Sequence, residues 1–186
     1  MNPENYRPIA LLNTIVKIFT QIIYIRTKKW CHINNLLPEF QSGFRSNRSC
    51  LDNIFTLNSL VQLKLKRKAG KLFAVFVDFK RAFPSVDHGL LWRKLYEYGL
   101  SVKILKILIS LYDKAKMCVK SREGISNAIE ITEGLMQGDT ISPILFALLI
   151  RDLETFLRDR GSRGVEINNL INILLLAFAD DIVIVA

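Results

Sequence analysis

The sequence predicts an α+β fold, with a sheet of a few strands backed by helices. Some stretches repeat apolar residues at helical spacing, such as Ile15, Ile18, Phe19, Ile22 and Ile23. Others, above all KLFAVFVDF at 71–79, are short and rich in β-branched and aromatic residues, which is typical of a buried strand. Half of the 186 residues are hydrophobic, so the chain can bury a sizeable core.

Local signals place the elements along the chain. Clusters of Gly, Pro, Ser and Asn, as in LLPEFQSGFRSNRSC, predict loops. Ser142 and Pro143 are typical of a helix start, and Gly161 of a helix end. In chain order we expect helices at 14–30 and 51–68, a strand at 71–79, helices at 88–99 and 101–112, strands at 115–120 and 128–132, a helix at 142–161, and strands at 170–178 and 182–186.

The charge balance indicates a polyanionic partner. There are 26 Lys and Arg against 17 Asp and Glu, a formal charge of +9. This excess favours nucleic acid or an anionic membrane face. The longest apolar windows, 141–150 and 170–179, fall short of the roughly 18 to 20 residues that a membrane helix needs. We therefore expect no membrane partner.

The sequence contains few indications of the cellular compartment. The N-terminal MNPENYRPIA has no charged start followed by an apolar core, so it does not predict a signal peptide. Cys31, Cys50 and Cys118 are odd in number and widely spaced, without zinc-site spacing. We expect a reducing, intracellular compartment, with nucleus and cytoplasm not distinguished and the oligomeric state not predicted.

Carboxylates stand where two predicted strands end. In LLLAFADDIVIVA at 174–186, Asp180 and Asp181 lie between apolar runs, and Asp78 ends the strand at 71–79. Burying such charges without counter-charges is costly. Carboxylates that converge at one end of a sheet repel each other unless a proton or a cation intervenes. Taken alone, adjacent aspartates also fit a plain turn.

A divalent metal would remove the repulsion. Mg²⁺ prefers oxygen ligands and is usually held by one or two carboxylates together with substrate phosphates. Two such ions, roughly 3.5–4 Å apart, support phosphoryl transfer by activating the attacking hydroxyl and stabilising the leaving oxygen. The carboxylates therefore suggest phosphoryl-transfer chemistry, provided that other motifs agree.

Five blocks occur in a fixed order: NYRPIALLNTIVKIFTQII, QSGFRSNRSCLDNI, FVDFKRAFPSVDH, GLMQGDTISPILFALLI and FADD. Together they resemble the successive reverse transcriptase blocks of jockey-like, non-LTR retrotransposons, over nearly the whole chain. The resemblance implies the fingers and palm of a right-handed polymerase, with an antiparallel palm sheet backed by helices and an end before the thumb. It assigns 1–70 to the fingers and 71–186 to the palm with part of the fingers.

The implied activity is RNA-directed DNA synthesis. It would use two Mg²⁺ ions, with Mn²⁺ as an alternative, an RNA template, a DNA primer and dNTPs. The resemblance makes Asp78, Asp180 and Asp181 the catalytic metal ligands, with the backbone of Phe79 near the metal. Asp180 is the firmer ligand of the pair, because successive residues of a strand point to opposite sides. Phe178 replaces the more usual Tyr.

Further positions are implied to bind substrate. Phe83 matches a steric gate against the ribose 2′-OH, and Ala82 would place backbone near the triphosphate. Gln137 and Gly138 match a loop that holds template and incoming nucleotide, where glycine permits close backbone approach. Arg7 would bind the triphosphate.

Basic residues are the candidates for nucleic-acid contact. Arg45 and Arg48 match basic finger positions, with guanidinium groups suited to phosphate, but solvated loop charges are an equal alternative. The run that contains Lys64, Lys66, Arg67, Lys68 and Lys71 fits a nucleic-acid backbone stripe or a solvated helix end.

Two alternatives to reverse transcription stay open. One is an inert remnant or nucleic-acid-binding module, which truncation favours and the intact aspartates oppose. The other is a polymerase that copies RNA into RNA, which Phe83 opposes. Because the chain ends shortly after Asp181, we expect either a fragment of a polyprotein or a truncated copy, with the final IVIVA strand leaving apolar surface uncovered.

Overall fold

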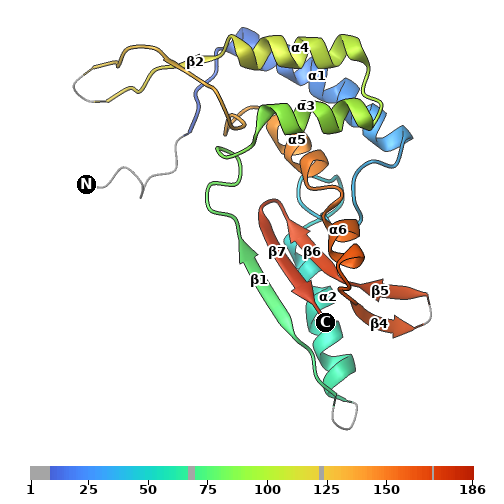
Figure 1. Ribbon diagram of the computed structural model, residues 1–186. Helices are drawn as coiled ribbons and strands as arrows, with labels where there is room; N and C mark the ends of the chain where they lie inside the picture. The colour runs from blue at the N-terminus through green and yellow to red at the C-terminus, as the bar shows by residue number, and fades with distance from the viewer. Residues whose placement is uncertain (1–8, 67–69, 122–123, 169) are drawn as a thin grey trace. The chain divides into compact units, whose positions relative to one another are not determined.

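The structure is a computed structural model that describes residues 9–66, 70–121, 124–168 and 170–186 (Figure 1). It is α+β with antiparallel strand pairs, as the sequence predicts. The chain divides into two compact units, each built from two segments: Met1–Asn34 with Phe83–Phe146, and Asn35–Ala82 with Ala147–Ala186. The expected fingers and palm boundary at residue 70 stays a prediction.

The first unit is mainly helical (Figure 1). Helices α3 and α4 pack against each other. Gly99 ends α3 at a φ of +83°, which glycine adopts without strain, and the next N–H, of Leu100, donates to the carbonyl of Leu95 at 3.0 Å. The elements are α1 (Thr14–Ile33), α3 (His88–Glu97), α4 (Val102–Asp113), β2 (Lys116–Met117), β3 (Ile129–Glu130) and the start of α5 (Ser142–Leu149).

Helix α1 buries few of its large apolar residues. Its buried stripe consists mostly of small side chains: Thr20, Ile23, Thr27 and Cys31. Its larger apolar side chains stay exposed: Ile15, Ile18, Phe19, Ile22 and Ile25. Periodicity therefore located the helix correctly, and of the apolar residues that predicted it Ile23 is buried while the others are exposed. Small side chains let the helix backbone lie close to its neighbours, which a row of isoleucines would prevent.

The second unit contains the main sheet. Its strands follow the order β1-β7-β6, all antiparallel, and β4 and β5 form a separate hairpin. The elements are α2 (Cys50–Leu65), β1 (Ala74–Asp78), α6 (Leu153–Asp159), β4 (Val165–Asn168), β5 (Ile171–Ile173), β6 (Leu175–Phe178) and β7 (Asp181–Val185).

Helices cover both faces of this sheet (Figure 1). On one face, Ile182 and Ala177 pack with Phe40 and with Leu153 and Leu157 of α6. On the other face, apolar residues of α2 and β4 join those of β7: Leu57, Leu60, Val165, Val183 and Val185. Because successive side chains of β7 point to opposite faces of the sheet, the strand contributes apolar residues to two separate cores.

The sequence misjudged which strand is covered. The strand at 71–79 was expected to be buried, but β1 is an edge strand and Phe76 is 72% exposed. The final strand was expected to be uncovered, but β7 lies in the middle of the sheet and Val185 is fully buried. Composition cannot separate the two cases, because both strands are equally apolar and only pairing order decides their burial.

Two predicted elements are split. The helix expected over 142–161 is α5 and α6, separated by turns at 150–152, where the N–H of Leu153 donates to the carbonyl of Ile150 at 3.0 Å. This bond spans three residues, so it replaces one helical bond by a tighter turn. The strand expected over 170–178 is β5 and β6, which belong to different sheets, and β4 was not predicted. The other predicted helices and strands are present, with shorter bounds for β2 and β3.

None of the three cysteines forms a disulfide: Cys31 is buried, and Cys50 and Cys118 are exposed. No helix within the described ranges has the length and hydrophobicity that crossing a membrane requires.

The strand order leads to a stability prediction. Ile182→Ala in the central strand should lower the free energy of unfolding by about 2–5 kcal/mol, because it leaves a cavity. Phe76→Thr on the edge strand should change it by about 0.5 kcal/mol or less, because the side chain is exposed and Thr suits a strand. Urea unfolding of both variants tests this; equal losses would contradict the order β1-β7-β6.

Candidate active site

The end of the main sheet brings two of the three predicted aspartates together. The register pairs Asp78 of β1 with Asp181 of β7, and Asp181 also faces Phe178 of β6. Directly opposite residues project from the same face, with Cβ atoms roughly 4.5–5.5 Å apart. Asp180 lies in the turn between β6 and β7. Pairing thus places Asp181, rather than Asp180, opposite Asp78, while the ranking of the pair as metal ligands stays a prediction.

These carboxylates have no partner among the described residues. Asp78 and Asp181 are exposed, Asp180 is half-buried, and none forms a hydrogen bond or ion pair with the described part of the chain. Like charges opposite each other on a sheet are destabilising. A cation bound there would relieve this repulsion.

The donor set can be compared with a metal site. In the described ranges, no group of three or more His, Cys, Asp or Glu side chains is close enough to hold a metal ion. Two facing carboxylates with open oxygens nevertheless fit Mg²⁺, which is usually held by one or two carboxylates and completed by substrate phosphates and water. Phe79, expected near the metal by its backbone, follows β1 directly.

The turn that carries Asp180 is held by a buried glutamine. Gln41 donates from Nε2 to the carbonyl of Ala179 at 2.9 Å, and its Oε1 accepts from the N–H of Ala179 at 2.9 Å. Ala179 has a φ of +58°, a left-handed conformation that costs a non-glycine residue about 1–2 kcal/mol. Two hydrogen bonds, each contributing about 0.5–1.5 kcal/mol, are enough to offset that cost.

The backbone around Gln41 also pairs with β6. The N–H of Ala177 donates to the carbonyl of Phe40 at 2.7 Å, and the N–H of Ser42 donates to the carbonyl of Ala177 at 2.8 Å. Asn53 of α2 adds a bond from Nδ2 to the same carbonyl at 3.0 Å. The sequence does not predict that Gln41 and Asn53 support the turn and β6. Their partners lie far along the chain, and no local sequence pattern indicates these contacts.

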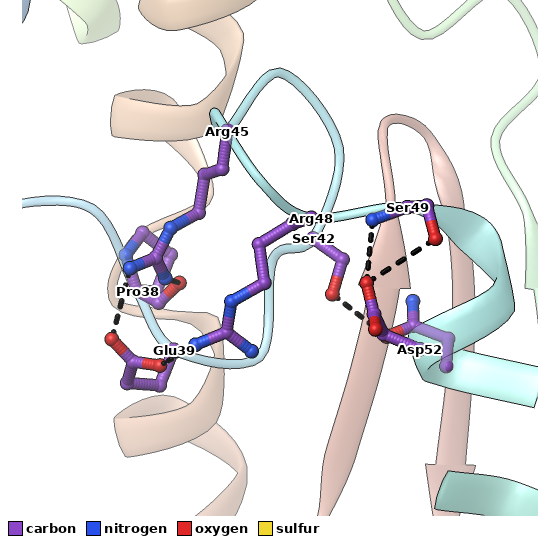
Figure 2. A network of polar contacts seen from close by, with 8 residues as sticks. Pro38, Glu39, Ser42, Arg45, Arg48, Ser49 and Asp52 are labelled. Carbon is purple, nitrogen blue, oxygen red and sulfur yellow. Dashed lines mark hydrogen bonds and ion pairs between the residues drawn. The ribbon is translucent and has the colours of Figure 1, made fainter. Parts of the chain in front are cut away.

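Arg45 and Arg48, predicted to bind nucleic acid, pair with one glutamate in the same loop. Figure 2 shows Glu39 between the two guanidinium groups, at 2.9 Å from Arg45 and 2.7 Å from Arg48. Arg45 also donates to the carbonyl of Pro38 at 3.0 Å. The hydrogen bond from Arg45 holds the pKa of the Glu39 carboxyl below its usual value. Both arginines therefore have a partner within the chain, and a phosphate would compete with Glu39 for them.

The other predicted basic residues are spread differently. Lys64 lies in the last turn of α2 and Lys66 is its C-cap, positions favourable to the helix dipole. Lys71 is exposed. Arg7, Arg67 and Lys68 lie outside the described residues. Both interpretations of the basic run, the nucleic-acid stripe and the solvated helix end, stay open.

The first unit holds Phe83, the predicted gate. Its ring stacks on Phe146, with centroids 4.9 Å apart and planes at 20°. Its carbonyl accepts from the N–H of Leu135 at 2.7 Å, which joins it to the loop before Gln137. Ala82, which is buried, belongs to the second unit. Phe83 thus has a defined place beside the predicted nucleotide loop.

The backbone of Ala10 contacts the loop of Gln137 and Gly138. The N–H of Ala10 donates to the carbonyl of Gln137 at 2.9 Å. Gly138 has a φ of +109°, and a Cβ there would lie 2.8 Å from the carbonyl oxygen of Ala10. Close backbone approach to a substrate at Gly138 stays a prediction, while in the structure the backbone of Ala10 lies where a Cβ would point. The glycine is required by its own conformation as well.

The fold matches that of reverse-transcribing polymerases. Telomerase from Candida albicans, in complex with the TWJ fragment of telomeric RNA, matches with a TM-score of 0.61 and 17% identity, over 92% of this chain and 30% of that chain. Apo telomerase from Candida tropicalis, truncated from its C-terminal domain, matches with a TM-score of 0.61 and 18% identity, over 95% of this chain and 38% of that chain. At these identities the likeness shows the fold, and it confirms the predicted fold class.

The family follows from the sequence. The family model for reverse transcriptase (RNA-dependent DNA polymerase) matches residues 2–186, so the chain belongs to this family. The Xenopus laevis transposon TX1 uncharacterized 149 kDa protein is 29% identical over 98% of this chain and 14% of its own length. The Drosophila funebris RNA-directed DNA polymerase from mobile element jockey is 26% identical over 99% of this chain and 19% of its own length.

A third relative has a higher identity over less of the chain. The Popillia japonica Pol polyprotein from type-1 retrotransposable element R2 is 31% identical over 72% of this chain and 22% of its own length. These relatives confirm the predicted resemblance to non-LTR retrotransposon reverse transcriptases. The chain spans less than a quarter of the length of each of the three. Polymerases of this family generally use divalent metals.

The Glu39 contacts lead to a pH prediction. Glu39→Gln should lower stability at about pH 7 by no more than about 1 kcal/mol, because the carboxylate is exposed. The folded-state pKa of Glu39 is depressed, so this contribution is present above its ordinary value of 4.5 and is lost as the pH falls through the folded-state value. Urea unfolding across this range, with the exposed Glu166→Gln as a control, measures it; a difference that persists in acid would contradict it.

Proposed function

We propose that the chain carries the polymerising centre of an RNA-directed DNA polymerase of a non-LTR retrotransposon. The substrates are dNTPs, a DNA primer and an RNA template, and the cofactor is a pair of Mg²⁺ ions. The primer 3′-hydroxyl attacks the α-phosphorus of the dNTP, a new P–O bond forms, and the bond to pyrophosphate breaks. The membership of the reverse transcriptase family does not favour the inert-remnant alternative.

One observation carries this proposal: the register that pairs Asp78 with Asp181, with Asp180 in the adjoining turn. All three carboxylates lie at one end of a sheet, with no hydrogen-bond partner for their oxygens among the residues that the structure describes, in a chain of the reverse transcriptase family. Bound Mg²⁺ would supply charge neutralisation for the triphosphate and a lower pKa for the primer hydroxyl. Asp78, Asp180 and Asp181 would hold the metal, and the backbone of Phe79 would lie beside it.

The remaining assignments support the same reaction. Arg7, Ala82, Gln137 and Gly138 would bind the nucleotide, and Phe83 would exclude the ribose 2′-OH by a steric clash. Lysine and arginine side chains would contact phosphates of template and primer, which a net charge of +9 favours: Arg45, Arg48, Lys64, Lys66, Arg67 and Lys68. For Arg45 and Arg48 this requires exchange of the Glu39 carboxylate for phosphate.

Loss of one carboxylate gives the direct test. Asp180→Ala should abolish primer extension on an RNA template with dNTPs and Mg²⁺, because the metal loses a ligand. The assay uses the protein with whatever natural sequence flanks these residues, beside Asp159→Ala, which removes an exposed aspartate from the end of α6.

Three results are informative in this assay. Extension by the wild type and by Asp159→Ala, lost in Asp180→Ala, supports the proposal. No extension by a folded wild type would overturn it and leave the inert remnant. Extension that survives Asp180→Ala would remove Asp180 from the metal site.

The choice of sugar gives a second test. Phe83→Ala should raise incorporation of NTPs relative to dNTPs by roughly tenfold or more, because the clash with the 2′-OH is removed. The ratio is measured on a single preparation, so that the fraction of folded protein cancels. A wild type that prefers NTPs would instead support an RNA-copying polymerase, and an unchanged ratio in Phe83→Ala would exclude the gate.

A further inference from the structure

We propose that Gln41 is a positioning residue for the catalytic turn, fixing Ala179 and through it Asp180. Its side chain lies 138 residues from Ala179 along the chain, yet it bonds both the N–H and the carbonyl of that residue. This inference rests on the proposed function, because the turn matters only if its aspartates hold metal. The contact itself belongs to a single compact unit.

The two bonds define the turn geometrically. A peptide group is planar, so holding the N–H of Ala179 fixes the plane that joins it to Phe178. Holding the carbonyl of Ala179 fixes the plane that joins it to Asp180. With both planes set and φ at +58°, little freedom is left for the position of the Asp180 Cα. Gln41 therefore acts on Asp180 without touching its carboxylate.

The glutamine is itself held in one orientation. Its Oε1 accepts a second bond, from the N–H of Gly43 at 2.8 Å, and the side chain is only 1% exposed. Two N–H donors face Oε1, so turning the amide over would oppose donor to donor. Gly43 must stay glycine, because a Cβ there would lie 2.4 Å from the backbone nitrogen of Ala179. The loop and the turn thus fit at backbone contact.

Only an amide completes this arrangement. A carboxylate at position 41 would keep both acceptor bonds but would turn an oxygen toward the carbonyl of Ala179, so the donor bond would become a repulsion. An apolar side chain of similar length would leave the N–H and carbonyl of Ala179 without these partners. Gln41→Glu and Gln41→Met therefore separate loss of the donor from loss of the whole contact.

Asn53 of α2 contacts the same hairpin and provides a matched control. Asn53 braces β6 at Ala177, with Nδ2 at 3.0 Å from the carbonyl, and its Oδ1 accepts from Ser42 at 2.8 Å. Within the described part of the chain Asn53 forms no hydrogen bond with the turn, so Asn53→Leu removes polar bracing of β6 and leaves Ala179 held by Gln41. A merely structural role for Gln41 would make the two substitutions equivalent.

The experiment uses the protein with whatever natural sequence flanks these residues. Hydrogen exchange of the Ala179 amide should speed up on the order of tenfold in Gln41→Met and stay at the wild-type rate in Asn53→Leu. In primer extension, Gln41→Met should lower kcat by about 10²-fold and raise the Mg²⁺ concentration for half-maximal rate, with KM for template and primer little changed. Gln41→Glu should shift kcat and the Mg²⁺ dependence in the same direction, while the Ala179 amide, whose bond to an acceptor oxygen is kept, should exchange near the wild-type rate.

The outcomes separate this inference from the proposed function. Unchanged exchange at Ala179 in Gln41→Met, or equal Mg²⁺ dependence in Gln41→Met and Asn53→Leu, would overturn the positioning role. Should Gln41→Met not fold, Gln41→Glu decides by kcat and by the Mg²⁺ dependence, which wild-type values in that variant would settle against the positioning role. If the folded wild type does not extend primers, the proposed function fails, and with it the catalytic meaning of the contact, while hydrogen exchange still decides whether Gln41 fixes the turn.

Discussion

The antiparallel register of β7 is the constraint on which the rest of the second unit depends. It pairs Ile182 with Val77 and Asp181 with Asp78 at the same time. A slip by one residue would turn Ile182 and Ile184 away from their core and Asp181 away from Asp78. The hydrophobic cores on the two faces of the sheet therefore stabilise the arrangement of the aspartates as well. Core packing and site geometry follow from one choice of pairing.

The same arrangement explains how aspartates can lie among apolar strands. They lie where the strands end, so Asp78 and Asp181 keep contact with water and avoid the cost of burial. Their mutual repulsion across the pair remains, and it is confined to one end of a sheet that is otherwise stabilised by apolar packing. A site with open oxygens and unrelieved repulsion is one in which cation binding is favourable.

The sequence was informative about elements and less so about their surroundings. Helical periodicity located α1, α3 and α4, and the motif order led to the family. Burial of β1 was predicted wrongly, since it depends on which element packs against which, and local pattern does not contain that information. Asp78, Asp180 and Asp181 could be proposed as site residues because carboxylates after apolar strands are conspicuous, and that role stays a prediction.

Gln41 could not be found in the same way, because a glutamine in a polar loop looks solvated until its partner is known. Within a few residues, the loop that contains Gln41 makes two different kinds of contact. Glu39, with a side chain that is 75% exposed, holds the guanidinium groups of Arg45 and Arg48, while Gln41 is buried against Ala179. Exchange of Glu39 for a phosphate would occur on the exposed part of this loop and needs no change in the contact at the turn. The exposed part of the loop can therefore bind a polyanion while the position of Asp180 stays fixed.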